Sequence, residues 1–297
     1  MESLIVIVGF LGAGKTTLLK RLVKNYIDIG KKPTIILNDY QNAQIESQQF
    51  LDFLEPDQIN SLSGSCICCS GIAELRTQVN SIPQRENGIT LIEANGTSDA
   101  CSLMGFLGVG LNEHLLPPIQ IGVVDVKNWQ KRDYNNILEA NQVQVSSMII
   151  LNHHEGVSEE RIEDVKKDMN YFNPSAKVVL WNDLKIDHFT DLIPSTNSPE
   201  KMDHLKSHWA SCSVDLPDPM SSESLKTVLK QIPESVLRVK GCTKLDENKG
   251  YTYFERVPTG EVSMRPYFGD LITGPKLLSI GPGSDPELLS NLIEKLT

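Results

Sequence analysis

The stretch from Gly9 to Leu22, GFLGAGKTTLLKRL, constrains the fold of this chain more than any other segment. The residues before it, Leu4 to Val8, form an apolar and mostly β-branched run, which is typical of a parallel strand buried on both faces. After the glycines, apolar residues recur at helical spacing, at Leu18, Leu19, Leu22, Val23 and Tyr26. The segment therefore predicts a strand, a loop and a helix in that order.

The loop matches the Gly-x-x-x-x-Gly-Lys-Thr pattern of a phosphate-binding loop. Its glycines let backbone N–H groups close on a polyphosphate, its lysine reaches the outer phosphates, and its hydroxyl ligates Mg²⁺. The following helix N-terminus adds a dipole that favours the anion. A chance glycine-rich turn would not need the flanking strand and helix. We expect a nucleoside triphosphate to bind at Gly9, Gly12, Ala13, Gly14, Lys15, Thr16 and Thr17, with Lys15 catalytic and Thr16 on Mg²⁺.

Length and charge limit the classes of function. A chain of 297 residues can bury a large core and predicts more than one domain. A formal net charge of −10 argues against a nucleic acid partner, which needs a basic surface. No apolar run approaches the roughly 20 residues that span a bilayer, and the start MESLIVIVGF lacks the basic region and cleavage site of a signal peptide. Six cysteines are too few for a disulfide framework. We expect a cytoplasmic protein with no membrane partner.

Later apolar runs alternate with segments of helical pattern, which predicts an α/β fold with a mainly parallel sheet and helices on both faces. These runs are Thr34–Leu37, Ile89–Ile92, Ile119–Val124, Met148–Leu151 and Val178–Trp181. Residues 1–193 are the expected nucleotide-binding domain. Residues 194–210 are rich in Pro, Ser, Asn, Asp and Lys and are interpreted as a linker.

Residues 211–297 predict a small α+β domain. The expected strands are Ser213–Leu216, Val236–Val239, Tyr251–Arg256, Glu261–Pro266 and Lys276–Ile280. The expected helices are Ser221–Gln231 and Asp285–Leu296.

A second chemical feature is the motif Ser65-Cys66-Ile67-Cys68-Cys69. In an extended loop Cys66 and Cys68 project to one side and Cys69 to the other, so a modest bend brings two or three thiolates onto one soft cation. Buried small hydrophobes or a redox pair are the alternatives for such a motif taken alone. Its place one βα step after a phosphate loop favours metal binding.

Taken together, these motifs resemble the CobW-type P-loop GTPases, which include metallochaperones and metallocofactor-insertion proteins. The resemblance covers nearly the whole chain. It rests on GFLGAGKTTLL at Gly9–Leu19, CICC at Cys66–Cys69, the ExxG match at Glu93–Gly96, Val123-Val124-Asp125, and Leu237-Arg238-Val239-Lys240-Gly241 in the C-terminal domain. It implies a GTP/GDP switch with Mg²⁺, coupled to delivery of a transition metal, often zinc and in some members cobalt or iron, to a client metalloprotein. A homodimer is one assembly that the resemblance leaves open.

The resemblance also suggests roles for single residues. Glu93 ends a predicted central strand, where its carboxylate reaches Mg²⁺ or its waters, and Gly96 offers a backbone N–H to the γ-phosphate. A helix cap is the alternative role for Glu93. Asp39 falls where the family has a switch carboxylate, which could touch Mg²⁺, the catalytic water or the cysteine-bound metal.

Three departures from the family pattern stand out. Ser65 replaces the usual glycine before the cysteines, and the segment Asn38–Ala43 has fewer acidic residues than the family's switch. The base loop reads Asn152-His153-His154-Glu155 instead of Asn-Lys-x-Asp. Glu155 keeps a carboxylate for guanine on a longer arm, and His153 could stack on the base. A metal site at the adjacent histidines is disfavoured because neighbouring side chains diverge.

Two functions remain open on the sequence. The first is a GTPase metallochaperone in which Lys15, Asp39 and Glu93 serve catalysis and Cys66, Cys68 and Cys69 hold the metal. The second is a metal-responsive nucleotide-binding adaptor that hydrolyses weakly or not at all, as the altered switch and base motifs suggest. A small-molecule kinase is a third, less favoured reading.

Overall fold

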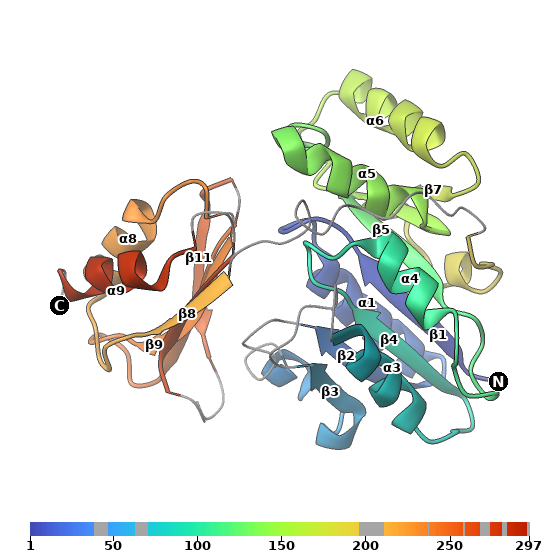
Figure 1. The fold of residues 1–297 in the computed structure, drawn as a ribbon, viewed down its shortest axis with the longest axis horizontal. Coiled ribbons are helices and arrows are strands. Elements are labelled where there is room, and N and C mark those ends of the chain that lie inside the picture. The colour runs from blue at the N-terminus through green and yellow to red at the C-terminus, as the bar shows by residue number, and fades with distance from the viewer. Residues whose placement is uncertain are drawn as a thin grey trace. The chain divides into compact units, whose positions relative to one another are not determined.

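A parallel sheet of seven strands forms the centre of the N-terminal unit, in the order β3-β2-β4-β1-β5-β6-β7 (Figure 1). The computed structural model describes residues 1–38, 47–62, 71–195, 211–236, 238–257, 259–267, 274–280 and 284–295. The strands are β1 (Ser3–Val8), β2 (Lys32–Asn38), β3 (Ile59–Leu62), β4 (Gly88–Glu93), β5 (Ile119–Asp125), β6 (Met148–Asn152) and β7 (Lys177–Leu180). Each neighbouring pair is parallel.

Helices cover both faces of this sheet. On one face α1 (Lys15–Asp28) packs its apolar side on the strands, together with the short 3₁₀ turns Gln48–Phe50 and Ile186–Phe189. The other face is covered by α3 (Gly71–Ser81), α4 (Ala100–Leu107), α5 (Asn136–Gln144) and α6 (Glu159–Phe172). Further 3₁₀ turns lie at Pro56–Gln58, Asp133–Asn135 and Trp181–Asp183. Within the ranges given above, no helix is both long and apolar enough to cross a bilayer.

The strand order determines where a ligand can bind. The central strand β1 pairs with β4 on one side and with β5 on the other. Strands β2 and β3 lie on the β4 side and strands β6 and β7 on the β5 side, so the order of the strands in the sheet reverses its direction beside β1. In open α/β sheets the crevice for ligands lies outside the carboxyl ends of the strands at such a point. The loops that follow β1, β4 and β6 leave the sheet at this edge.

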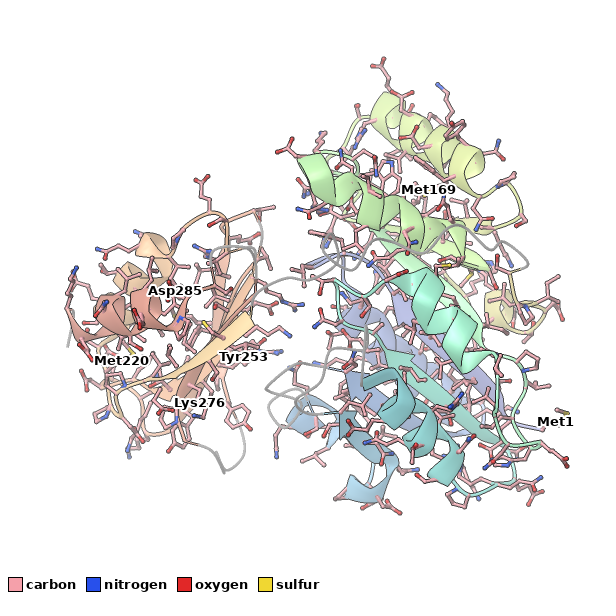
Figure 2. All side chains as sticks on the ribbon, viewed as in Figure 1. Met1, Met169, Met220, Tyr253, Lys276 and Asp285 are labelled. Carbon is pink, nitrogen blue, oxygen red and sulfur yellow. The ribbon has the colours of Figure 1, made fainter. Side chains whose placement is uncertain are left out.

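The second compact unit contains an antiparallel sheet in the order β11-β10-β9-β12-β8. Its strands are β8 (Ser211–Asp215), β9 (Arg238–Lys244), β10 (Tyr251–Arg256), β11 (Val262–Pro266) and β12 (Lys276–Ile280). Helices α8 (Ser222–Gln231) and α9 (Pro286–Glu294) share an apolar core with one face of it. Figure 2 shows Met220 on the helix side of this sheet and Tyr253 on the other side.

The structure confirms the expected fold class, adds the unpredicted strand β3 and corrects the limits of β9. The strand expected at Val236–Val239 is β9, which runs from Arg238 to Lys244 instead. It pairs with both β10 and β12, and this pairing on two sides extends the strand through buried polar residues such as Lys240 and Thr243. The domain limits at 193 and 210 remain predictions, because residues 196–210 lie outside the described residues.

Candidate functional site

The loop between β1 and α1 depends on its glycines. Gly9, Gly12 and Gly14 have φ values of 147°, 80° and 104°, a region of backbone conformation that favours glycine. A Cβ atom on Gly9 would lie 2.4 Å from the carbonyl oxygen of Val123, and one on Gly14 would lie 2.3 Å from Nδ2 of Asn152. The loop therefore packs too closely on its neighbours for any side chain at these two positions.

Lys15 bends back over this loop. Its Nζ donates hydrogen bonds to the carbonyl oxygens of Gly9, at 2.9 Å, and Phe10, at 3.2 Å, and the residue is 4% exposed. The sequence predicted that this side chain faces a ligand. Here the ammonium group lies along the loop, and its role toward a nucleotide remains a prediction.

Thr16 and Glu93 meet at the carboxyl edge of the sheet. Glu93 ends β4, pairs in register with Ile7 of β1, and is 6% exposed. Thr16 Oγ1, in the first turn of α1, donates a hydrogen bond of 2.8 Å to Glu93 Oε1. A hydroxyl and a carboxylate oxygen are ligands that suit Mg²⁺, so the expected pair of Mg²⁺ ligands has fitting chemistry. Thr17, the next residue, is exposed.

Gly96 lies directly against the phosphate loop. A Cβ atom on Gly96 would lie 2.6 Å from Cδ2 of Leu11 and 2.8 Å from its backbone nitrogen. On its other side, Gln142 Nε2 of α5 donates to the carbonyl oxygens of Gly96, at 3.1 Å, and Ser98, at 3.3 Å. The segment after β4 is thus held between the loop and α5.

The loop after β6 also contacts the phosphate loop. Asn152 Nδ2 donates to the carbonyl oxygen of Ala13 at 2.9 Å. His153, at φ 54°, places Nε2 3.0 Å from the carbonyl oxygen of Gly12. Because a carbonyl oxygen only accepts, Nε2 carries the proton in this contact. Glu155 is exposed, so of the three expected base-loop residues two touch the phosphate loop and one faces solvent.

A buried charge cluster lies beside the phosphate loop, and the sequence did not predict it. Arg132 pairs with Asp125 at 3.1 Å and with Glu139 at 2.5 Å, and its guanidinium stacks on the Phe10 ring with 4.4 Å to the centroid. Burial raises the pKa of Glu139 to about 7, against the opposing charge of Arg132. The short turn Asp133–Asn135 lets the chain fold back so that residues seven apart can pair.

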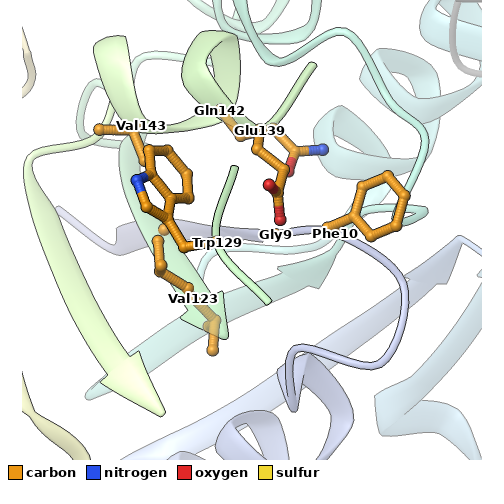
Figure 3. A pocket seen from close by; sticks show the side chains of 9 residues that line it. Gly9, Phe10, Val123, Trp129, Glu139, Gln142 and Val143 are labelled. Atoms are coloured by element: carbon orange, nitrogen blue, oxygen red, sulfur yellow. The ribbon is translucent and has the colours of Figure 1, made fainter. Parts of the chain in front are cut away.

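Glu139 also lines a small cavity at this place. Figure 3 shows its carboxyl group directed toward Gly9, between Phe10 and Trp129. The cavity is lined by Gly9, Phe10, Gly122, Val123, Val124, Trp129, Glu139, Gln142 and Val143, and its volume of about 10 Å³ is near the least that holds one water molecule.

Four expected site residues, Asp39, Cys66, Cys68 and Cys69, lie outside the described residues. Among the residues that the structure does describe, no group of three or more His, Cys, Asp or Glu side chains could hold a metal ion. Cys101, Cys212 and Cys242 are buried.

Comparison with known proteins gives a family match and several relatives. A family model described as "CobW/HypB/UreG, nucleotide-binding domain" matches residues 3–180. The zinc-regulated GTPase metalloprotein activator 1 of Dictyostelium discoideum is 24% identical over 212 residues, which cover 59% of this chain and 44% of that protein. The zinc chaperone YjiA of Escherichia coli (strain K12) is 39% identical over 70 residues, 24% of this chain and 21% of that protein. The matched parts thus span less than half the length of these two relatives.

One solved structure aligns with the whole chain. The crystal structure of Zn(II)-bound YjiA GTPase from E. coli aligns with 100% of this chain and 99% of that chain, at 17% sequence identity and a TM-score of 0.43.

Proposed function

This chain belongs to the CobW/HypB/UreG nucleotide-binding family, and on that basis we propose that it is a GTP-hydrolysing metallochaperone or metallocofactor-insertion protein. It binds a transition metal, zinc before cobalt or iron, through Cys66, Cys68 and Cys69, and delivers it to a client metalloprotein. The cytoplasm, where thiols stay reduced, is the compartment we expect.

One observation supports the nucleotide part of this proposal most. Two segments converge on the phosphate loop and the first turn of α1. The end of β4 and the residues after it make two contacts, Glu93 with Thr16 and Gly96 with Leu11, and the end of β6 makes one, Asn152 with Ala13. A purely structural glycine turn needs no such support. A loop that must present its backbone N–H groups to a triphosphate does, because preorganised donors bind an anion without a further ordering cost.

In the proposed mechanism, the backbone of Gly12 to Thr16 cradles the phosphates and Lys15 moves from its carbonyl partners to the outer phosphate oxygens. Thr16 and Glu93 supply oxygen ligands for Mg²⁺, which neutralises phosphate charge when bound. Gly96 offers its backbone N–H to the γ-phosphate, and Asp39 is the switch carboxylate.

We also propose a preference for GTP over ATP that is smaller than an Asn-Lys-x-Asp loop provides. Asn152 and His153 lie on the phosphate loop, where such a base loop begins. Glu155 is the carboxylate for guanine, and its exposed position and longer arm are the reason for the smaller preference. Titration with both nucleotides decides the point, and an equal or inverted preference would refute the base assignment.

The names of the relatives support the metal part. Two of them are called a zinc-regulated GTPase metalloprotein activator and a zinc chaperone. In this chain the cysteine motif lies between Asp39 and Glu93 in the sequence. We propose that movement of either switch segment changes the distances between the sulfurs. Because coupling between two binding sites is reciprocal, nucleotide then alters zinc affinity by the same factor as zinc alters nucleotide affinity, typically 5–150-fold.

The deciding experiment measures phosphate release with GTP and with ATP, in Mg²⁺ alone and with added Zn²⁺, Co²⁺ or Fe²⁺. Metal-stimulated, multiple-turnover release from GTP supports the metallochaperone. Tight binding without turnover supports the adaptor instead, and phosphate transfer to a small molecule would indicate a kinase.

A zinc titration in the nucleotide-free, GDP and non-hydrolysable GTP states tests the cysteine motif. We expect the affinity to change with nucleotide state and to be lost in the Cys66→Ala/Cys68→Ala/Cys69→Ala variant. Cys212→Ala, a buried cysteine of the C-terminal sheet, is the matched control and should bind zinc normally. Identical affinities in the three states would leave only a structural metal, and an unchanged triple variant would place the metal elsewhere.

A further inference from the structure

Helix α5 holds both ends of the segment that follows β4. At its first end, Gln142 Nε2 donates to the carbonyl oxygens of Gly96 and Ser98. At its second end, the neighbouring Asn141 accepts through Oδ1 from the backbone nitrogens of Ala100, at 3.1 Å, and Cys101, at 3.4 Å. Two adjacent side chains of one helix thus hold a segment that lies 40 to 46 positions earlier in the sequence.

Gln142 is itself held in place. It is 2% exposed, and its backbone carbonyl oxygen accepts hydrogen bonds from Gln120 Nε2 at 3.1 Å and from Ser146 Oγ at 2.7 Å. The side chain therefore extends from a fixed point of the helix.

The other side of the segment is closed by the phosphate loop. Gly96 lies so near Leu11 that a single added carbon would come within 2.8 Å of the loop's backbone nitrogen. The Gly96 segment is thus hydrogen-bonded to Gln142 and in contact with Leu11 of the phosphate loop.

We propose that Gln142 is a positioning residue that holds the Gly96 backbone against the phosphate loop and thereby sets the preference for triphosphate over diphosphate. The assignment rests on the proposed function, in which Gly96 meets the γ-phosphate. A diphosphate lacks this group, so releasing the segment weakens triphosphate binding and leaves diphosphate binding as it was. Loss of one such preorganised contact corresponds to about a tenfold change in affinity.

Two substitutions separate the hydrogen bond from the volume of the side chain. Gln142→Glu keeps the length and turns an acceptor toward two carbonyl oxygens, whereas Gln142→Met keeps a similar volume and removes the donor. Thr243→Val is the matched control, because Thr243 is a fully buried polar residue of β9 in the second unit, and its hydroxyl donates to the backbone carbonyl oxygen of Pro217 at 3.0 Å.

The experiment measures two quantities in each variant: the affinities for GDP and a non-hydrolysable GTP analogue, and the amide hydrogen exchange of residues 94–98 in the nucleotide-free protein. We expect both Gln142 variants to lose about tenfold in triphosphate affinity with GDP affinity unchanged within about twofold, and to exchange faster at residues 94–98. Thr243→Val should keep the wild-type affinity ratio.

An equal loss for both nucleotides, or a retained ratio with unchanged exchange, would overturn the assignment of Gln142 while leaving the switch itself intact. A wild-type protein that binds the two nucleotides equally would instead overturn the proposed switch, and the assignment with it. The two failures are thus distinguished by the wild type alone.

Discussion

Replacing Asn152 tests whether the loop after β6 supports the phosphate loop. The residue is 8% exposed, and its Nδ2 donates to the carbonyl oxygen of Ala13, which is fully buried. The same amide lies against Gly14, the residue that precedes α1. The side chain therefore contacts the two residues that directly precede helix α1.

The structure sets the size of the expected effect. In Asn152→Ala the donor is lost and the Ala13 carbonyl oxygen remains buried without it, which costs about 1–3 kcal/mol of unfolding free energy. In Asn152→Asp the size is kept, but an acceptor with a negative charge faces a carbonyl oxygen in a buried place, and burying a carboxylate costs several kcal/mol. We therefore expect aspartate to destabilise more than alanine, an order that a loss of packing alone would reverse.

Urea unfolding of the wild type and both variants gives the free energies, and nucleotide titration gives the affinities. Asn80→Ala is the matched control, since Asn80 makes the same kind of amide-to-carbonyl bond, 2.8 Å to Gly110, at an exposed site away from the phosphate loop. It should leave nucleotide affinity unchanged, whereas both Asn152 variants should lower it. Aspartate as stable as wild type, or alanine less stable than aspartate, would refute the reasoning.

Three further predictions concern the same site. Lys15→Ala and Thr16→Ala should each weaken Mg²⁺-triphosphate binding about tenfold or more without unfolding the protein, because a lost bond to a charged group is worth about 1.5–3 kcal/mol; unchanged affinity and turnover in both would contradict the phosphate-loop assignment. Gly9→Ala should destabilise the protein by about 1–3 kcal/mol, because Gly9 has a positive φ and an added Cβ would clash with a strand carbonyl oxygen. Gly30→Ala, at φ 77° with nothing within 4 Å of an added Cβ, should meet no clash and destabilise less. Equal losses in urea unfolding would argue against the clash. Burial raises the pKa of Glu139 from its ordinary 4.5 to about 7, so between these pH values the folded protein binds a proton that the unfolded chain has lost. Protonated Glu139 therefore stabilises the fold by up to about 3 kcal/mol. This stabilisation is complete below pH 4.5 and is lost as the pH rises through 7. Urea unfolding at several pH values should show this slope in the wild type and not in Glu139→Gln, and a stability that rises over the same range would give the opposite sign.

Local sequence patterns predicted most elements of the fold. The apolar runs and turn residues placed β1, β4, β5, β6, β10 and β12 within one or two residues of their observed limits, because strands buried on both faces need long apolar runs. The pattern failed at β3 (Ile59–Leu62), which the sequence did not predict, and at β9. In both strands polar residues interrupt the run, and only pairing with neighbouring strands keeps them extended.

The sequence by itself determined the chemistry of the phosphate loop. Three glycines, a lysine and a threonine at fixed spacing require one backbone path, and the structure gives each of these glycines a positive φ. Such a motif can be recognised in a sequence because its constraints are local, and all the residues that form the phosphate loop lie within eight positions.

Only the tertiary structure decided what surrounds that loop. Gln142 contacts Gly96, which lies 46 positions earlier in the sequence, and Asn152 contacts Ala13, which lies 139 positions earlier. Arg132 and Glu139 pair beside Phe10 across a turn for which the sequence has no apolar pattern. These polar contacts form because the sheet brings the ends of β1, β4 and β6 to one edge, where a buried amide or carbonyl must find a partner. A single sequence carries no pattern for such pairs, since each partner is an ordinary polar residue until the fold places it beside the other.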